Sequence, residues 1–454
     1  MVRMGGLLPQ LKAIVGEANL IDDPDRLQTY GVDGKRPKAV ALPGSQEEVS
    51  KLLALANDHG LAVIPMGSGT KREIGALPKR LDLVVSTLRL NRITDCDCDN
   101  LTLSAEGGLT LGEVQKRLAR EGRGYFLPLD PPFSEKATLG GIVASNASGP
   151  GRLLYGTARD LVIGAKAVLP NGDLVATGGK TVKNVSGYDL CKLLIGSYGT
   201  LGILCEITFK LLPLPEKAAT LVLPYPGLEG AVAFSQEILR SQYLPSSMEI
   251  LNPSAVERLN LEVSSKGYYL LAIRLEGVVE AVERQLSEMG EKGRQKGAIS
   301  QDVLQGEAHE AFWEAIRNFP ERMRGEGGKG IRLKSSFLIS RCGEVMAQYE
   351  RIGQDHRLNC ALLCHSGNGI LYTSVFPDGG RRVSKKAVLD AIGAFSSVAS
   401  QYEGHLVVER CPSSWKGEIE VWGPPRSDYG IMRRLKEEFD PKGILNPGRF
   451  IDGL

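Results

Sequence analysis

The stretch TLGGIVASNASG at residues 138–149, rich in glycine, alanine and serine, is the part of this sequence that decides its fold. A second glycine-rich stretch, PMGSGTK at residues 65–71, follows a short apolar run that predicts a strand. Backbone N–H groups in such a turn form a concavity that binds anions, and glycine lets a phosphate approach closely. The 65–71 stretch has neither the spacing of a Walker A loop nor that of G-x-G-x-x-G. By itself it is therefore interpreted either as a phosphate-binding loop or as an ordinary tight turn.

The overall composition narrows the class of protein. Lys and Arg number 55 against 53 Asp and Glu, and this net charge of +2 does not favour a nucleic-acid groove or a basic membrane-binding face. No apolar run approaches the roughly 18 residues of a membrane span, and the first residues do not resemble a secretory signal. Glycine is unusually frequent, at 54 of 454 residues. The composition excludes an integral membrane protein, a disulfide-rich secreted domain and a disordered chain.

The eight cysteines show no cluster spacing. The close pairs are CDC at residues 96–98 and C-x-x-x-C at residues 360–364, whereas iron–sulfur proteins show runs such as C-x2-C-x2-C. Cys191 and Cys205 stand in apolar stretches that predict strands, where cysteine acts as a small buried hydrophobic residue. We therefore expect structural, reduced cysteines and a cytoplasmic protein.

The N-terminal half alternates helix and strand signals. The capping boxes SQEE at residues 45–48 and TLGE at residues 110–113 predict two helices, which end at Gly60 and Gly122. Strands are predicted at residues 61–65, 82–87 and 202–212.

A hairpin and a domain boundary follow. Residues 160–178 read as two strands around the turn Asn171-Gly172, which is a strong hairpin signal. Pro213 and Pro215 then interrupt the chain, and we place a domain boundary there.

The second half contains a weak internal repeat of the order β-α-β-β-α, which is the ferredoxin-like arrangement. It predicts one antiparallel sheet covered by helices. The predicted strands are residues 218–226, 246–252, 267–277, 331–340, 360–366 and 369–376, and the predicted helices are residues 228–241, 278–292, 342–354 and 381–402.

Several glycine-rich blocks occur in a specific order along the chain. They are TLGG at residues 138–141, YG at 155–156, RD at 159–160, GYDL at 187–190, GSYGTLG at 196–202 and FDPKGILNPGRF at 439–450. In this order and spacing they resemble the PCMH-type FAD-binding domain of the vanillyl-alcohol oxidase superfamily. Within it, they resemble the flavin subunits of bacterial glycolate oxidase and the D-lactate and D-2-hydroxyglutarate dehydrogenases.

The resemblance covers almost the whole chain and implies an α+β fold. It implies a PCMH-type FAD-binding domain of two subdomains at residues 1–214 and a ferredoxin-like antiparallel cap, the substrate domain, at residues 215–439. A C-terminal segment, residues 440–454, is expected to return to the FAD-binding domain.

The resemblance also implies bound FAD. Some relatives attach FAD covalently through a His or Cys, but none of the five histidines falls in these blocks, so we expect non-covalent FAD. The residues that the resemblance assigns to FAD are Pro65, Met66, Gly67, Ser68, Gly69 and Thr70 around the pyrophosphate, Asp130, Pro131, Thr138, Gly140 and Gly141 on its other side, Ala144, Ser145, Asn146 and Gly149 beside the ribityl chain and flavin ring, Ile203 at the adenine, and Asn446 near the ring.

The metal-binding pattern of these relatives is broken in this chain. Dehydrogenases of D-2-hydroxy acids carry G-H-x-G-D-G-N-x-H and G-E-H-G stretches, whose two His and one Glu bind a divalent metal. Here the first stretch keeps His365 but has Tyr372 at the second His, and the other keeps Glu409 but has Arg410 in place of His. One His and one carboxylate make a poor metal site, so we expect none. We hypothesise that Arg410 replaces the metal by holding a substrate carboxylate; the alternative is a pairing with Glu409 or solvent.

The departures also resemble the accessory flavin subunit of glycolate oxidase, which lacks the metal motifs. That subunit has GS-x-GTLG, as here with Tyr198, and an Arg or Lys on a cap strand after W-x-x-x-R. Here residues 313–317 read WEAIR, followed by Arg332 and Lys334. The i, i+2 spacing allows both cations to share a strand face, although such a pattern is also typical of a solvated face.

The resemblance implies oxidation of a 2-hydroxy acid such as glycolate or lactate, with electrons passing to a partner iron–sulfur subunit. A second flavin subunit and peripheral attachment to the inner membrane through such a complex are further expectations. A flavin-bearing relay or scaffold subunit is the alternative. The candidate catalytic residues are His365 as general base, or else a core histidine, and Tyr372 as a hydrogen-bonding or packing residue, together with Glu409, Arg410 and Lys334.

Overall fold

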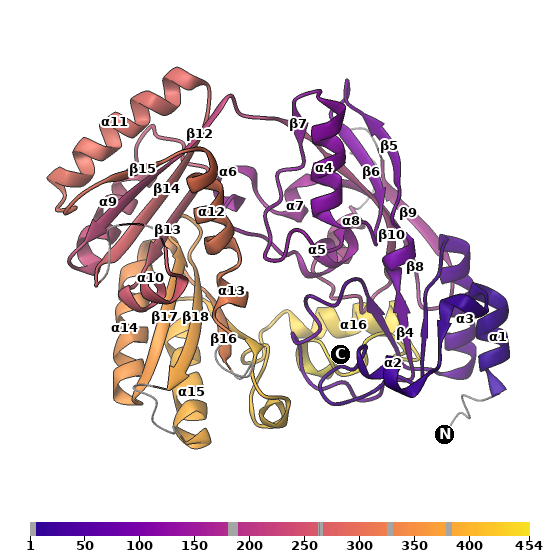
Figure 1. The fold of residues 1–454 in the computed structure, drawn as a ribbon. Coiled ribbons are helices and arrows are strands. Elements are labelled where there is room, and N and C mark those ends of the chain that lie inside the picture. Colours follow the sequence, from indigo (N-terminus) through magenta and orange to yellow (C-terminus); the bar gives the residue numbers. More distant parts are fainter. Residues whose placement is uncertain (1–5, 180–188, 262, 264–266, 325–329, 378–383) are drawn as a thin grey trace. The chain divides into compact units, whose positions relative to one another are not determined.

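The computed structural model describes residues 6–179, 189–261, 263, 267–324, 330–377 and 384–454. Two compact units are present (Figure 1). The first comprises residues 1–148, 156–214 and 425–454, and the second comprises residues 149–155 and 215–424. Compared with the expected division, residues 149–155 group with the second unit, and the chain returns to the first unit at Pro425 rather than at residue 440.

The first unit begins with a four-stranded sheet in the order β1-β2-β4-β3, in which β2, β4 and β3 run parallel. Apolar side chains of α1 and α3 pack against it in one core. These elements are β1 (Leu20–Ile21), β2 (Ala39–Ala41), β3 (Val63–Met66), β4 (Leu83–Ser86), α1 (Leu8–Val15) and α3 (Gln46–His59).

The two capped helices are confirmed. Ser45 Oγ accepts a hydrogen bond from the backbone N–H of Glu48 at 3.3 Å, and α3 ends at Gly60, where φ is +62°. Thr110 caps α4 (Leu111–Glu121) in the same way, and Gly122 ends it with φ of +65°. Both ends need a left-handed residue, which glycine adopts without strain.

The first unit also contains a five-stranded antiparallel sheet, in the order β5-β6-β10-β8-β9, and a two-stranded one of β11 (Leu212–Pro213) and β7 (Tyr125–Phe126). The predicted hairpin is confirmed, since β8 and β9 pair around a turn in which Gly172 has φ of +93°. The strand predicted around Cys191 is wrong, because Cys191 and Leu194 bury their side chains from one turn of helix α8. Part of the GYDL block lies outside the described residues. The elements are β5 (Ile93–Asp97), β6 (Thr102–Glu106), β8 (Val162–Val168), β9 (Leu174–Gly178), β10 (Ile203–Lys210), α5 (Leu139–Ser145) and α8 (Cys191–Leu194).

The C-terminal segment completes the first unit after α16 (Tyr429–Phe439), drawn in yellow in Figure 1. Leu445 forms a parallel bridge with Val63, and the backbone N–H of Asn446 donates to Val63 O at 2.9 Å. Buried Asp440 pairs with Lys436 and accepts the backbone N–H of Leu445 at 2.8 Å. This segment is therefore fixed against the strand that leads into the 65–71 turn.

The second unit contains one eight-stranded antiparallel sheet, in the order β15-β12-β14-β13-β17-β18-β16-β19. Each of the six predicted strands corresponds to an observed strand, but the one predicted at residues 331–340 ends at Ser336, before a 3-10 turn at Ile339–Arg341. The strands β15 and β19 are additional to the prediction. The strands are β12 (Lys217–Tyr225), β13 (Ser247–Leu251), β14 (Tyr269–Gly277), β15 (Asp302–Leu304), β16 (Ile331–Ser336), β17 (Leu358–His365), β18 (Ile370–Pro377) and β19 (His405–Arg410).

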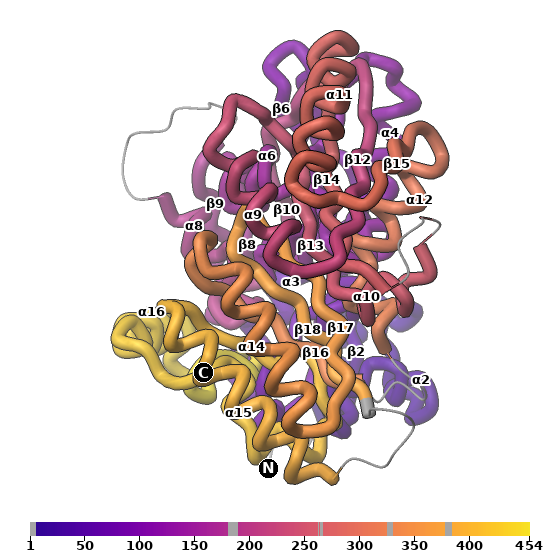
Figure 2. The backbone as a smooth tube through the Cα atoms, turned by 90° about the vertical axis from the view of Figure 1, so that its left-hand side faces the viewer, coloured from indigo at the N-terminus to yellow at the C-terminus, as the bar shows by residue number. Residues whose placement is uncertain are grey.

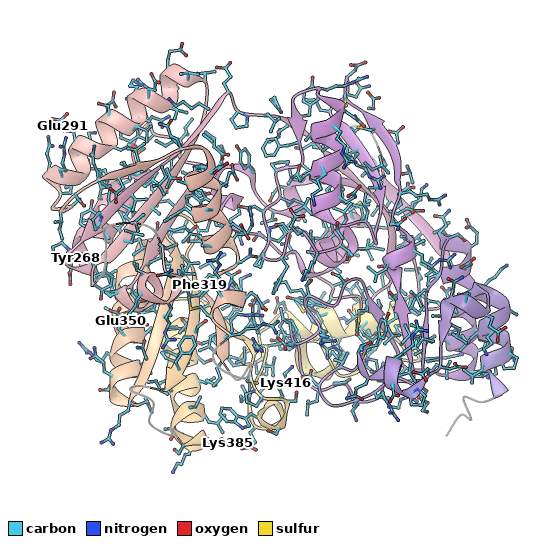
Figure 3. The ribbon with its side chains drawn as sticks, viewed as in Figure 1. Tyr268, Glu291, Phe319, Glu350, Lys385 and Lys416 are labelled. Carbon is cyan, nitrogen blue, oxygen red and sulfur yellow. The ribbon has the colours of Figure 1, made fainter. Side chains whose placement is uncertain are left out.

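Helices cover both faces of this sheet, because strand side chains alternate between the faces. On one face a large apolar core joins the strands to α9, α11, α14 and α15, and Figure 2 shows these helices in front of the strands. On the other face a smaller core joins the strands to α10, α12 and α13, whose Phe319 is fully buried (Figure 3). The helices are α9 (Leu228–Leu239), α10 (Pro253–Leu259), α11 (Val279–Gln295), α12 (Gly306–Arg317), α13 (Phe319–Arg322), α14 (Cys342–Asp355) and α15 (Lys385–Gln401).

None of the helices in the described ranges has the length and apolar character that a membrane crossing requires.

Candidate functional site

The glycine-rich blocks meet in a pocket of the first unit. Seven residues that the sequence assigned to FAD line it, together with five that it did not assign. The assigned ones are Pro65, Met66, Gly67, Gly140, Gly141, Ala144 and Ile203, and the others are Thr87, Tyr198, Gly199, Gly202 and Leu204.

Crowding of the backbone explains why glycine stands at these positions. A Cβ atom on Gly67 would collide with Thr138 Oγ1, so the 65–71 turn lies directly against the 138–149 stretch. A Cβ atom on Gly140 would lie 2.8 Å from the backbone oxygen of Gly107. Closely packed, side-chain-free backbone is what a diphosphate requires of its binding site.

The GSYGTLG block is bonded to the end of helix α5. The N–H of Tyr198 donates to Ala144 O at 2.8 Å, and Asn446 Nδ2 donates to Tyr198 O at 2.7 Å. Tyr198 itself has φ of +52°, an uncommon value for a residue with a side chain. Through Asn446, the C-terminal segment therefore contacts Tyr198, which lines the pocket.

Asn146 supplies a polar atom without a bonding partner. It ends helix α5 in the left-handed conformation, with φ of +44°. Its Oδ1 is buried and accepts no hydrogen bond within the described ranges. A buried acceptor of this kind is costly unless a donor reaches it. The residues present therefore fit a ligand that carries hydroxyl or N–H donors, as FAD does.

The remaining assigned residues lie outside the pocket lining. Ser68, Gly69 and Thr70 continue the first turn, and Ser145 Oγ donates back to Gly141 O at 2.7 Å. Asp130 and Pro131 lie in the loop that precedes α5. Gly149 groups with the second unit.

A buried row of ionisable side chains lies on one face of the sheet in the second unit. Glu249 of β13 and His365 of β17 stand directly opposite in the strand register. Both carboxylate oxygens of Glu249 lie 2.6 Å from His365 Nδ1, and both side chains are almost fully buried. Glu249 fixes the imidazole orientation, and a proton at Nδ1 leaves the other ring nitrogen as an acceptor.

Lys334 and Tyr372 continue this row. They are opposite residues of β16 and β18, and Lys334 Nζ lies 5.7 Å from the centre of the Tyr372 ring. Burial lowers the pKa of Lys334 and raises the pKa of Tyr372. Within the described ranges Lys334 has no ion-pair partner. The His365 ring packs edge-on against Tyr372, with 5.4 Å between ring centres.

A bulge brings Glu409 and Arg410 to the same face. Arg410 is opposite Arg332, but the next pair is Leu333 with Val408, so Glu409 is the extra residue of β19. Glu409 Oε2 accepts from Arg332 Nε at 2.9 Å, and both side chains are buried. Bulges commonly re-aim a side chain in this way. The solvated-face alternative for Arg332 is therefore wrong.

The donor set around His365 does not fit a divalent metal. His365 is held by Glu249, and Glu409 is paired with Arg332. Among the residues that the structure describes, no third His, Cys, Asp or Glu atom converges on His365; the one such group of three lies elsewhere, at Cys96, Cys98 and Glu121.

The sequence did not point to Glu249, because it stands in the apolar run SMEIL and gains its meaning only from its strand neighbour. Trp313, by contrast, is core as expected, and its Nε1 donates to Thr220 Oγ1 at 2.7 Å.

Comparisons with known proteins cover both units. The family described as FAD binding domain matches residues 37–178, and that described as FAD linked oxidases, C-terminal domain, matches residues 214–409 and 422–450. Glycolate oxidase subunit GlcD of Bacillus subtilis is 30% identical, over 97% of this chain and 95% of that protein. The chain belongs to the FAD-linked oxidase family.

Dehydrogenases of 2-hydroxy acids are also similar to this FAD-linked oxidoreductase over most of its length. D-lactate dehydrogenase of Archaeoglobus fulgidus is 29% identical over 91% of each chain, and D-2-hydroxyglutarate dehydrogenase of Xanthomonas citri is 28% identical over 97% of this chain and 96% of that protein. The protein is an FAD-linked oxidoreductase of the glycolate oxidase, D-lactate and D-2-hydroxyglutarate dehydrogenase family, and its cofactor is FAD. The finer likeness to an accessory subunit stays a prediction.

Solved structures show the same fold. A structure of p-cresol methylhydroxylase matches with a TM-score of 0.78 at 17% identity, over 98% of this chain and 96% of that one. A structure of alkyldihydroxyacetonephosphate synthase matches with a TM-score of 0.77 at 20% identity, over 98% of this chain and 86% of that one. The expected PCMH-type, α+β architecture is confirmed.

Proposed function

We propose that this FAD-linked oxidoreductase oxidises a small 2-hydroxy acid, such as glycolate or lactate, and passes the electrons to a partner iron–sulfur protein. The observation that carries the proposal is the row of Glu249, His365, Tyr372, Lys334 and Arg410 on one sheet face, in which Lys334 is half-buried and the other four side chains are buried. A small 2-hydroxy acid is complementary to this row. Its carboxylate suits the cationic side chains, and its hydroxyl suits the oriented imidazole.

Lys334 and Arg410 would bind the substrate carboxylate. A guanidinium and an ammonium form stronger hydrogen bonds to a carboxylate than neutral donors do. Arg332 forms an ion pair with Glu409 and would keep that carboxylate away from the substrate. The resemblance places Arg410 at the position of a metal-binding His of D-2-hydroxy-acid dehydrogenases, so Arg410 would supply positive charge in place of that metal.

His365 would accept the proton of the substrate hydroxyl. Its Nδ1 faces Glu249, which holds the ring and stabilises the imidazolium that forms. Tyr372 stays neutral because burial raises its pKa, so its phenol is available as a hydrogen-bond donor to the substrate. FAD, when bound, supplies the acceptor for the hydride of the alcohol carbon.

The first unit would hold FAD without a covalent bond. In this proposal the turn at residues 65–70 surrounds the pyrophosphate, and Asp130, Pro131, Thr138, Gly140 and Gly141 line it from the other side. Asn146 offers its buried Oδ1 to a donor of the cofactor. Ile203 is opposite Val168 of β8, but on its other side it stands beyond the β6–β10 ladder, which begins at Glu206, and this side would serve the adenine role.

Turnover with a dye acceptor tests the substrate. The FAD-loaded chain is assayed with glycolate, D-lactate and L-lactate, alone and with a co-expressed iron–sulfur subunit. The proposal expects one acid to be turned over. It expects Lys217→Gln, which removes a lysine of β12 paired with Glu283 at the surface, to match the wild type. Turnover of none of the acids in either preparation would contradict the proposal.

A further inference from the structure

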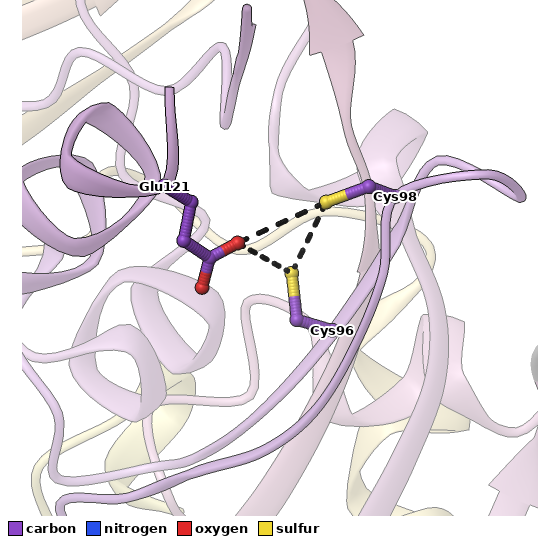
Figure 4. A group of neighbouring side chains, drawn as sticks. All are labelled: Cys96, Cys98 and Glu121. Carbon is purple, nitrogen blue, oxygen red and sulfur yellow. Dashed lines mark hydrogen bonds between the residues drawn. The ribbon is translucent and has the colours of Figure 1, made fainter. Parts of the chain in front are cut away.

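The side chains of two cysteines and one glutamate lie close together in the first unit (Figure 4). Cys96 lies in β5 and Cys98 directly follows that strand, so their side chains share one face. Their sulfur atoms are 3.6 Å apart. Glu121, the last residue of α4, places Oε2 at 3.8 Å from Cys96 Sγ and 3.9 Å from Cys98 Sγ.

These three separations are close to the edges of a tetrahedral zinc site. With Zn–S near 2.3 Å and Zn–O near 2.1 Å, tetrahedral angles put two sulfur ligands about 3.8 Å apart and a sulfur and an oxygen about 3.6 Å apart. The observed sulfur–sulfur distance is 3.6 Å, and the observed sulfur–oxygen distances are 3.8 and 3.9 Å. A cation therefore fits between the three atoms with small side-chain adjustments.

We propose that Cys96, Cys98 and Glu121 form a binding site for a thiophilic divalent cation, with Zn²⁺ as its natural occupant and water as fourth ligand. The three residues belong to neither the FAD pocket nor the ionisable row of the second unit. The site is structural, because it would fasten β5, the outermost strand of its sheet, to the end of α4.

The ligand types agree with this role. Zn²⁺ prefers thiolates with carboxylate or imidazole ligands, whereas Mg²⁺ and Ca²⁺ prefer oxygen ligands alone. Cys98 is 4% exposed and Glu121 is exposed, which leaves an entrance from the glutamate side.

Cobalt substitution tests the site in the FAD-loaded chain, prepared without a histidine tag and treated with a chelator. Tetrahedral Co²⁺ with thiolate ligands absorbs in the red, where oxidised flavin does not, and shows sulfur-to-metal charge transfer. We expect one Co²⁺ per chain with these bands, their loss on addition of Zn²⁺, and a higher melting temperature with Zn²⁺ than without metal. Cys96→Ser should abolish the thiolate bands, and Glu121→Gln should weaken metal affinity.

Cys191→Ser is the matched control, since Cys191 is a buried thiol of the same unit and should leave the bands intact. Wild-type chain without cobalt–thiolate bands, or with bands that survive in both Cys96→Ser and Cys98→Ser, would overturn the proposal. A disulfide between the two cysteines in the freshly purified chain, detected as a mass two hydrogens lower, would also overturn it. These readouts do not depend on turnover of a 2-hydroxy acid.

Discussion

Replacing Lys334 with methionine should weaken substrate binding and, at the same time, raise the stability of the fold. Methionine keeps most of the side-chain length but removes the cation from the sheet face. A hydrogen bond from a charged donor contributes about 1.5–3 kcal/mol, and each 1.4 kcal/mol is a factor of ten in affinity. Loss of the bond to the substrate carboxylate should therefore weaken substrate binding by about 10- to 150-fold.

The same change should stabilise the protein. Burial lowers the pKa of Lys334 in the folded state, so the folded chain disfavours the charged form. This penalty is complete below the folded-state pKa and disappears as the pH rises through the unfolded value, near 10.4. Lys334→Met should therefore melt at a higher temperature than the wild type at pH 7, and the gap should narrow toward pH 10.

Two assays check these predictions. The dependence of anaerobic flavin reduction on acid concentration gives the substrate affinity, and thermal melting followed by far-UV circular dichroism gives the stability. Lys217→Gln, on another strand of the same sheet, is the control for both. An unchanged apparent dissociation constant, or a lower melting temperature at pH 7, would refute the reasoning about Lys334.

Four further changes follow from the structure. Arg410→Ala should keep FAD but lose turnover, and unchanged kinetics would show that Arg410 does not hold the substrate. Glu249→Gln should slow flavin reduction about 10- to 100-fold at constant FAD content, the effect of losing a charged hydrogen bond; a rate within twofold would count against its role. Gly140→Ala should lower FAD content and destabilise the fold by about 1–3 kcal/mol. Gly179→Ala is the control, because open space surrounds its added Cβ, and it should change neither FAD content nor stability. Equal flavin absorbance in the two variants would contradict this prediction. Asp440→Asn breaks a buried ion pair and should cost about 3–5 kcal/mol in urea unfolding, so an unchanged midpoint would be inconsistent with the contacts of the C-terminal segment.

Local signals in the sequence were sufficient for most of the fold. Ser45 and Thr110 cap their helices, and Asn171-Gly172 turns its hairpin, because these effects involve neighbours in the chain. The strand β19 was missed because it begins only a few residues after the end of the long helix α15. The stretch around Cys191 was misassigned because a short apolar run does not distinguish a strand from one buried helical turn.

The candidate site was only partly predictable. His365, Glu409, Arg410, Lys334 and Tyr372 were chosen from their motifs, and the structure places all five on one sheet. Their arrangement, however, depends on pairing between strands that are far apart in sequence. The position of Glu249 opposite His365 and the bulge at Glu409 are properties of strand register, which no local pattern encodes.

The most direct test of the proposed function is the anaerobic stopped-flow absorbance of the FAD-loaded chain at the oxidised flavin band. The chain is mixed with glycolate, D-lactate or L-lactate in separate runs, and dithionite gives the fully reduced reference. We expect that one of these acids bleaches the band in a single turnover and that Arg410→Ala slows this bleaching. A flavin that dithionite reduces but none of the acids does would contradict the account and favour a relay or scaffold subunit.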